Sequence, residues 1–215
     1  MPFDWPALIT RPAGDYFPTW FDRIADHLLN GCRLLANGVP YRLIEVEVYY
    51  HGPGHEDTFT HRDPVQLVGG RWYFHRTRGA YRGGSFKGLD LTFGDGTAFG
   101  GMLIRRVALP DGSVIDGPSL TVDHLLKTTA HASVSALDAV IAERLGWVEG
   151  LPLQMVALPE MEIRPLLKSI RVGLTLKRRK FTENDPAFGF LFRSYRYLSE
   201  PKKTAKGKAH MVLPQ

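Results

Sequence analysis

The sequence has a single cysteine, Cys32, among its 215 residues. One thiol can form no disulfide within the chain and no cysteine-based zinc site. No stretch approaches the roughly 18 uninterrupted apolar residues of a transmembrane helix. The first residues, MPFDWPALITRPAG, lack the basic region and long apolar run of a signal peptide. We therefore expect a soluble protein without a membrane partner that is not secreted, and that works in the bacterial cytoplasm or, in a eukaryote, in the nucleus.

Internal repeats and low-complexity blocks are also absent from the sequence. Hydrophobic residues make up 44% of the chain and charged residues 23%, so there is enough apolar material for a packed core. The length suits one domain better than two. We expect a monomer with a single domain over residues 1–200 and a flexible, lysine-rich tail over residues 201–215.

The chain is basic, with a net charge of +5 and a pI near 9.4. A basic balance favours partners that carry phosphates, because each neutralised phosphate releases counterions. A mildly basic enzyme without a polyanionic partner has the same composition. Charge alone therefore leaves both interpretations open.

Helix signals and strand signals alternate irregularly along the chain. Apolar spacing predicts a helix that begins near Phe17 and stops at Asn30-Gly31. The stretch from Ser135 to Asp138 is typical of a capping box and predicts a helix that ends near Leu145. A further helix is expected over residues 117–131.

Asn37-Gly38 predicts the turn of a β-hairpin. Residues 51–70 are expected to form a loop. Further strands are expected over residues 71–76, 89–94, 101–109 and 151–158. Since no repeated strand–helix–strand order is present, we expect an α+β fold with a curved, mostly antiparallel sheet flanked by a few helices.

The strand in RLIEVEVYYHGPGHEDTFTH (residues 42–61) contains two glutamates, Glu45 and Glu47. Residues two apart in a strand point to the same face, so the valines between them face the other way. One interpretation is an amphipathic strand with two solvated acids. The other is a general base that projects into a groove beside Tyr49, where aromatic surface disfavours the charged form of a carboxylate.

Arg105 and Arg106 are adjacent in an otherwise apolar strand. Strict alternation would place them on opposite faces, so one of them would point inward or into a cleft. A buried arginine needs a partner of opposite charge. Glu47 and a phosphate group are the candidates.

Histidines and acids crowd the loop that follows the glutamate strand. Mixtures of imidazole and carboxylate groups bind zinc, iron or manganese. The spacing matches no known metal motif, however, and loop histidines are commonly free of metal, so we predict no bound metal. The residues concerned are His51, His55, Glu56, Asp57, His61 and Asp63.

Residues 71–87, RWYFHRTRGAYRGGSFK, interleave basic and aromatic side chains with glycines. Basic residues follow phosphates, aromatic faces stack on bases, and glycines allow close approach of a ligand. A basic, flexible hairpin with no ligand is the plainer alternative. We predict a nucleic-acid contact made by Arg71, Arg76, Arg78, Tyr81, Arg82 and Lys87. The KRRK run at residues 177–180 could add a second patch.

Five segments, in this order, resemble the alkyladenine (methylpurine) DNA glycosylase family. They are FDRIADHLLNGCRLLANGVPYRLIEVEVYY, RWYFHRTRG, GMLIRRV, GPSLTVDHLL and RVGL, and they extend over residues 20–200. The resemblance implies that Glu47 activates a water and that Arg105 contacts the phosphate of the target nucleotide. It also implies that Tyr49 and His61 hold an extruded base, with His75 as a second pocket wall where the family usually has tyrosine.

The sequence departs from the family pattern at two further positions. Arg78 stands where the family has a tyrosine wedge that fills the gap left by the base, and Tyr81 is an alternative wedge. Asp90 stands where the family has a pocket asparagine that discriminates between purines. Both changes bear on how duplex DNA and the target base are recognised.

The resemblance implies a DNA glycosylase that flips out a damaged base, an alkylated purine, and hydrolyses its N-glycosidic bond with no cofactor. No lysine belongs to the implied constellation, so we expect a monofunctional reaction. Two alternatives remain. One is a nucleic-acid binding protein that has the same fold and no catalytic activity, and the other is a metal-dependent nucleotide hydrolase that uses histidines and carboxylates.

Overall fold

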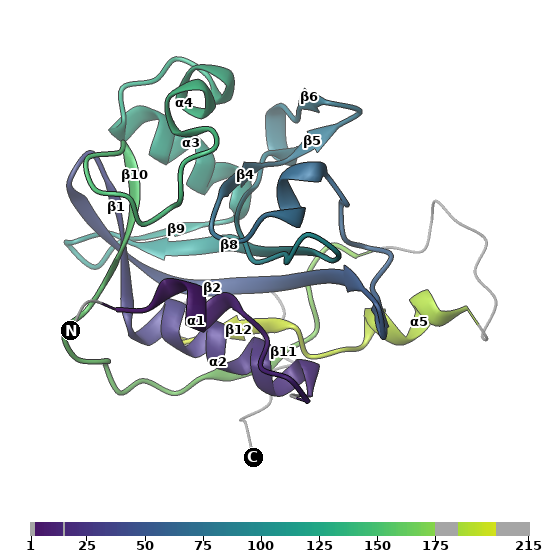
Figure 1. Cartoon of the computed structure of the whole chain (residues 1–215). Coiled ribbons are helices and arrows are strands. Elements are labelled where there is room, and N and C mark those ends of the chain that lie inside the picture. The colour runs from purple at the N-terminus through teal and green to yellow at the C-terminus, as the bar shows by residue number, and fades with distance from the viewer. Residues whose placement is uncertain (1–2, 15, 175–184, 201–215) are drawn as a thin grey trace.

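The computed structural model describes residues 3–14, 16–174 and 185–200. The expected tail (201–215) and the KRRK run (177–180) lie outside the described residues. Within these ranges, ten strands form one sheet in which every strand pair is antiparallel, and a short separate ribbon lies beside it. Helices pack around the sheet (Figure 1). The expected α+β class is confirmed.

The main sheet has the order β10-β1-β2-β8-β7-β4, with the long strand β2 near its centre. Four short strands extend it: β12 pairs with β2 and β11, β3 pairs with β2, and β9 pairs with β8. The separate ribbon consists of β5 and β6. The bounds are β1 Cys32–Ala36, β2 Val39–Gly52, β3 His55–Glu56, β4 Trp72–Phe74, β5 Arg76–Thr77, β6 Ala80–Tyr81, β7 Leu89–Thr92, β8 Phe99–Ala108, β9 Val114–Asp116, β10 Leu153–Ala157, β11 Leu167–Ser169 and β12 Arg196–Leu198.

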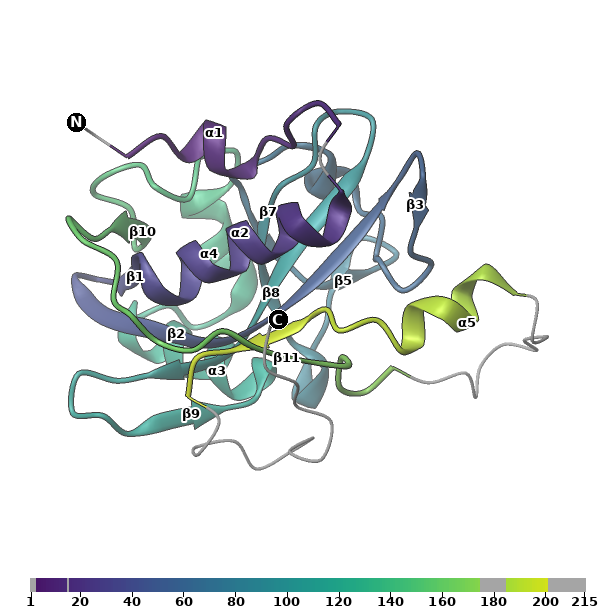
Figure 2. The same ribbon diagram turned by 90° about the horizontal axis from the view of Figure 1, so that it is seen from below.

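The described helices are short apart from two. They are α1 Trp5–Ile9, α2 Phe17–Asn30, α3 Pro118–Thr128, α4 Val134–Ile141 and α5 Pro186–Leu191. Helix α2 lies along the side of β2 opposite α3 and α4 (Figures 1 and 2). None of the helices in the described ranges has the length and apolar run needed to cross a membrane.

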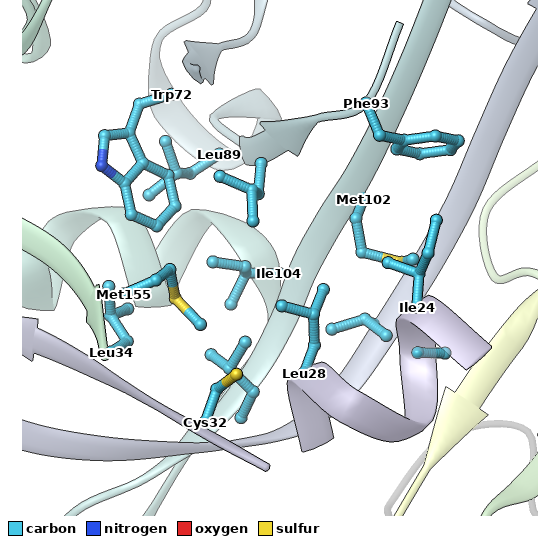
Figure 3. Close-up of a cluster of buried hydrophobic side chains, with 14 of the residues drawn as sticks. Ile24, Leu28, Cys32, Leu34, Trp72, Leu89, Phe93, Met102, Ile104 and Met155 are labelled. Atoms are coloured by element: carbon cyan, nitrogen blue, oxygen red, sulfur yellow. The ribbon is translucent and has the colours of Figure 1, made fainter. Parts of the chain in front are cut away.

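Helix α2 covers the main hydrophobic core. Its Ile24 and Leu28 point toward Met102 and Ile104 of β8 (Figure 3), and all four are buried. Fully burying one such side chain is worth about 1.5–3 kcal/mol. The predicted start at Phe17 and stop at Asn30-Gly31 are confirmed, and the Gly31 amide donates to the carbonyl of His27 as the helix closes.

The hairpin between β1 and β2 turns at Asn37-Gly38, as predicted. Both residues have positive φ, 45° and 80°, which the two-residue hairpin turn requires and which asparagine and glycine tolerate best. The turn sets the register in which Leu34 faces Tyr41. It therefore fixes the start of the strand that carries both glutamates.

The predicted bounds of α4 are wrong. The helix is capped by the Ser133 hydroxyl, which accepts from the Ala136 amide, and it ends at Ile141. Asp138 does not complete a capping box, because its carboxylate is bound by Arg76 at 2.7 Å and by the Tyr81 hydroxyl at 2.6 Å. Other local differences are minor: the expected loop of residues 51–70 contains β3 and a 3-10 helix at Pro64–Leu67.

Candidate active site

Four strands place side chains in one row across the sheet. Glu47 of β2 is paired with Leu103 of β8, Leu103 with Asp90 of β7, and Asp90 with Tyr73 of β4. Directly paired residues in a sheet project to the same face. Since neighbouring strands lie ~4.8 Å apart, Glu47 and Asp90 stand roughly 10 Å from each other across this face.

A cavity of about 270 Å³ lies over this row. Small-molecule pockets measure roughly 300–1,000 Å³, so this cavity suits a compact ligand. Its lining includes Tyr49, Leu103 and Arg105 from the central strands and Asp90 from β7. Loops, two 3-10 turns and the start of α3 supply the rest of the lining: Phe59, His61, Gln66, His75, Arg82, Ser85, Phe86, Lys87, Pro118, Val172, Gly173 and Leu174.

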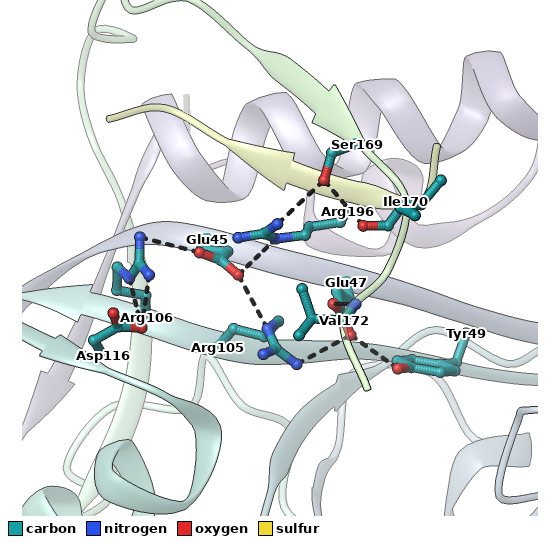
Figure 4. A network of polar contacts seen from close by, with 10 residues as sticks. All are labelled: Glu45, Glu47, Tyr49, Arg105, Arg106, Asp116, Ser169, Ile170, Val172 and Arg196. Atoms are coloured by element: carbon teal, nitrogen blue, oxygen red, sulfur yellow. Dashed lines mark hydrogen bonds and ion pairs between the residues drawn. The ribbon is translucent and has the colours of Figure 1, made fainter. Parts of the chain in front are cut away.

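Glu47 lies beneath the wall of this cavity and is fully buried. Its carboxylate accepts hydrogen bonds from the Tyr49 hydroxyl at 2.8 Å and from the Val172 amide at 2.7 Å (Figure 4). Arg105 approaches the same carboxylate at 3.4 Å. All three partners line the cavity. The interpretation of Glu45 and Glu47 as solvated acids is therefore wrong, because both side chains are buried and three arginines contact their carboxylates.

Glu45 is the centre of a buried ion-pair network (Figure 4). Its carboxylate contacts Arg105 at 3.0 Å, Arg106 at 3.2 Å and Arg196 at 2.8 Å. Arg106 also binds Asp116 at 2.6 Å. With Glu47 included, three carboxylates face three guanidinium groups, so the charges of the network balance.

Arg105 and Arg106 both reach Glu45, so the predicted placement on opposite faces is wrong. The pairing of β2 with β8 shifts register on both sides of Glu45. A β-bulge of this kind breaks the strict alternation and lets two consecutive residues point to one side. Of the two candidate partners for an inward arginine, Glu47 is the one that contacts Arg105 in the structure.

The network sets the protonation of its members. Burial alone would lower the pKa of the Arg105 guanidinium, but Glu47 and Glu45 outweigh it and raise that pKa. Burial raises the pKa of the Tyr49 hydroxyl, and the charge of Glu47 raises it further. Tyr49 therefore remains a hydrogen-bond donor to Glu47, and Arg105 remains a fixed positive charge at the cavity wall.

The opposite wall is a polar cluster around Asp90, which is buried. The His75 Nε2 atom lies 2.7 Å from one carboxylate oxygen of Asp90, and the Gln66 amide donates to the other at 3.3 Å. The rings of His61 and His75 meet edge to face, with centroids 4.3 Å apart. The structure thus brings together three of the predicted pocket residues, His61, His75 and Asp90.

His61 is a neutral imidazole in this cluster. Burial, and then the neighbouring His75, lower the pKa of His61 to about 4. The Tyr73 hydroxyl accepts from the Arg76 amide at 3.3 Å and lies 3.1 Å from Nδ1 of His61. We assign the hydroxyl proton to that contact, which leaves His61 with a proton on Nε2 and hence with a donor for a ligand.

Two glycines make room for the cluster. A Cβ atom on Gly101 would lie 2.4 Å from an Asp90 oxygen and 2.7 Å from the Gln66 amide nitrogen. A Cβ atom on Gly88 would lie 2.5 Å from the ring of His75. The acid, the amide and the imidazole therefore occupy space that any other residue at these two positions would fill.

The predicted nucleic-acid residues fall into four groups. Arg82 and Lys87 line the cavity, and Arg78 is exposed at the β5–β6 turn. Arg76 and Tyr81 are instead bound to Asp138.

Arg71 lies apart from the cavity lining, paired through its backbone with Leu145. The expectation that no lysine belongs to the constellation is wrong, because the loop after β6 brings Lys87 to the cavity wall, where it pairs with Asp123 at 2.9 Å.

The histidines and acids of residues 51–63 do not converge. His55 contacts the Tyr50 carbonyl at 3.0 Å and the Tyr195 hydroxyl at 2.8 Å. Asp57 forms a fully buried ion pair with Arg171. In the described part of the chain, no three histidine, cysteine or acidic side chains are grouped so that they could hold a metal ion.

Sequence reasoning missed several residues of the site. Val172, which binds Glu47, lies in the RVGL segment, but a backbone amide leaves no signal in side-chain chemistry. Gln66 carries no recognisable motif. Arg196 and Glu45 are 151 residues apart, so only the fold could pair them.

Fold and site together define an α+β protein with a compact polar cavity beside a buried acid–arginine network. No family model matches the chain. The chain is similar to "Uncharacterized protein L759" of Acanthamoeba polyphaga mimivirus, with 37% identity over 133 residues. The match covers 55% of this chain and 62% of the viral protein. The name of that relative states no activity.

Proposed function

We propose that the protein is a DNA glycosylase that hydrolyses the N-glycosidic bond of a damaged base, an alkylated purine, in base excision repair. The observation that carries this proposal is Glu47, a buried carboxylate held by Tyr49, Arg105 and the Val172 amide directly behind the cavity. A carboxylate fixed beside a compact cavity can activate one water without a metal or an organic cofactor.

The chemistry requires an attacking water and a leaving base. An ionised carboxylate has about four lone-pair positions, and three donors occupy Glu47, so one position remains for a water. The water oxygen bonds to the sugar carbon C1′ and its proton passes to Glu47. The C1′–N bond breaks and its electron pair leaves with the base. Negative charge on Glu47 also stabilises the positive charge that develops on the sugar.

Recognition of the base falls to the polar cluster. The ring of Tyr49 and the imidazoles of His61 and His75 provide walls for a flat ligand. Neutral His61 offers a donor, and Asp90 offers a carboxylate. A buried carboxylate beside the cavity favours a base that is positively charged or rich in N–H donors, which fits an alkylated purine.

Basic side chains of the protein lie beside the cavity, where they can contact the backbone of the nucleic acid. Arg82 and Lys87 line the cavity, Arg78 is exposed nearby in sequence at a hairpin turn, and Arg105 is fixed in the wall. Such groups attract phosphates and position the chain without reading its sequence. A base within a duplex must leave the stack before it can enter a cavity of this kind.

A second candidate is a nucleic-acid binding protein without catalysis. This second candidate is favoured by the burial of Glu47. The Glu47 carboxylate does not itself line the cavity, although its three hydrogen-bond partners do. Binding would then be retained and no base would be released.

The test is base release from oligonucleotides that carry alkylated or deaminated bases, with Glu47→Gln as the key variant. We expect Glu47→Gln to abolish release while affinity for the oligonucleotide stays near that of the wild type. The matched control is Glu56→Gln, which changes an exposed glutamate of β3. Normal release by Glu47→Gln would rule out the assigned role. Binding without release by the wild type, over the whole panel, would favour the second candidate.

A further inference from the structure

A buried ion pair joins two segments of the chain beside the cavity. Asp57 lies in the loop after β3, Arg171 follows β11, and neither side chain is exposed to solvent. Their charged groups are 2.5 Å apart. Taking two charges out of water is costly, and apolar residues of similar volume often stabilise a fold as well or better. The bonds that surround the pair point to a role beyond stability.

Asp57 shapes the loop that carries two walls of the cavity. Its carboxylate accepts from the Phe59 amide at 3.0 Å, and its carbonyl accepts from the Thr60 amide at 3.2 Å. Phe59 and His61 both line the cavity. Because the loop turns around the Asp57 carboxylate, the placement of these two walls depends on where that carboxylate is held.

Arg171 bonds to three parts of the chain through the two terminal nitrogens of its guanidinium. One nitrogen donates to Asp57 and to the Val48 carbonyl of β2 at 3.0 Å. The other donates to the Phe190 carbonyl of α5 at 3.1 Å. Burial alone would lower the pKa of the guanidinium, but the charge of Asp57 helps to raise it, so Arg171 stays protonated. The single ammonium group of a lysine cannot replace such a planar fork of donors.

Arg171 acts on Glu47 indirectly, through two of the hydrogen-bond partners of that carboxylate. The next residue in the chain, Val172, donates its amide to Glu47 at 2.7 Å (Figure 4). The guanidinium also covers the ring of Tyr49, at 4.5 Å from the ring centroid, and the Tyr49 hydroxyl donates to Glu47 at 2.8 Å. Two of the three donors that hold the proposed base are therefore tied to Arg171.

The wall on the other side of the cavity is held by bonds of its own. The His75 amide donates to the Gly88 carbonyl at 2.9 Å, and the Arg82 amide donates to the His75 carbonyl at 2.9 Å. The residues between Arg82 and Gly88 are thus attached to this wall at both ends. Loss of the ion pair should move the Asp57 loop relative to His75 and leave His75 in place.

We propose that Asp57 and Arg171 are positioning residues for the reaction. Together they set the distance between the Glu47 carboxylate and the wall made by His61, so that the activated water and the held base meet at one glycosidic bond. This inference rests on the proposed function and adds to it the pair that aligns its two halves. Neither residue belongs to the lining of the cavity that the described residues form, so neither touches the substrate. A misplacement of ~1 Å can cost about 100-fold in rate.

The first experiment compares Arg171→Lys with the wild type in single-turnover base release and in oligonucleotide binding. Lysine keeps the charge beside Asp57 but cannot bond on both sides, so release should slow by about tenfold or more. Affinity should stay near that of the wild type, because the basic side chains at the cavity are not held by this pair. The matched control is Arg33→Lys, which changes the arginine of an ion pair with Glu162 away from the cavity lining.

A double variant separates positioning from stability. Asp57→Asn alone leaves Arg171 buried without its counter-charge and should lower the melting temperature, whereas Asp57→Asn combined with Arg171→Met removes both charges and should regain much of it. Release by the double variant should still be slower than wild type by about tenfold or more, because methionine bonds to neither Val48 nor Phe190. A double variant that regains both stability and wild-type release would overturn the inference, since the pair would then only stabilise the fold.

A third readout does not depend on base release. Burial, and then the neighbouring His75, hold the pKa of His61 at about 4. In Arg171→Lys the loop should loosen and expose the imidazole, so an NMR titration should show the pKa of His61 rise toward 6.5. An unchanged pKa would overturn the inference.

The two readouts also distinguish this inference from the proposed function. If the wild type releases a base and Arg171→Lys releases it at the same rate, the positioning role fails and the glycosylase assignment stands. If the wild type releases no base from any oligonucleotide but the pKa of His61 rises in Arg171→Lys, the glycosylase assignment fails and the ion pair still positions the wall.

Discussion

Gly101→Ala tests whether the space around Asp90 shapes the pocket. The new Cβ atom would lie 2.4 Å from the Asp90 oxygen, whereas real Cβ contacts are hardly ever shorter than 3.0 Å. The carboxylate must therefore move by at least 0.6 Å, the difference between these two distances. The Gln66 amide, 2.7 Å from the same Cβ position, must move as well.

The cost follows from packing and from hydrogen bonds. Overpacking a well-filled interior costs about 1–3 kcal/mol. For a chain of this size, each kcal/mol lowers the melting temperature by roughly 2–4 °C. Displacing Asp90 also strains its contacts with His75 and Gln66, so base release should fall further than the loss of folded protein explains.

The assay pairs thermal unfolding with single-turnover base release below the melting temperature. Gly189→Ala is the control, because nothing lies within 4 Å of the added Cβ atom and the helical backbone accepts alanine. Unchanged stability and unchanged release in Gly101→Ala would refute the reasoning. Such a result would mean that Asp90 and Gln66 shift without consequence.

Two further predictions concern protonation and the lysine at the wall. Since the pKa of His61 is lowered from 6.5 to about 4, the unfolded state takes up a proton first as the pH falls. The free energy of unfolding of the wild type should drop between about pH 6.5 and pH 4, by up to roughly 3 kcal/mol. In His61→Gln, urea unfolding across this range should give a free energy that depends less on pH. The same pH dependence in the variant and the wild type would contradict the lowered pKa of His61. Because Lys87 is paired with Asp123, borohydride should trap no covalent adduct with DNA; an adduct that disappears in Lys87→Met would reveal a lyase reaction.

Local signals predicted the elements of this fold well. The helix stop at Asn30-Gly31 and the turn at Asn37-Gly38 depend on the backbone preferences of the residues themselves, so the local sequence predicts both. The capping box at Ser135 failed for a long-range reason: Asp138 is 62 residues from Arg76, and that partner takes the carboxylate that the local pattern assigned to a cap.

The site was predictable only in part for the same reason. Alternation correctly placed Glu45 and Glu47 on one face, but it could not foresee that Arg196 and Val172, from the far end of the chain, would help to bury them. Alternation failed outright at Arg105 and Arg106, because a bulge depends on how two strands are paired. The contact between the Val172 amide and Glu47 is a property of backbone position, and no residue type predicts it.

The attachment of residues 83–87 to His75 has a consequence for how such a protein can change over time. Arg82 and Gly88, which flank this segment, are both bonded to the backbone of His75, so the chain between them can be lengthened, shortened or replaced while the wall of the cavity stays in place. Under the proposed function, contact with the nucleic acid and selection of the base can then vary independently. Changes in a few exposed residues would then alter the nucleic acid that is bound without altering the residues proposed to carry the chemistry.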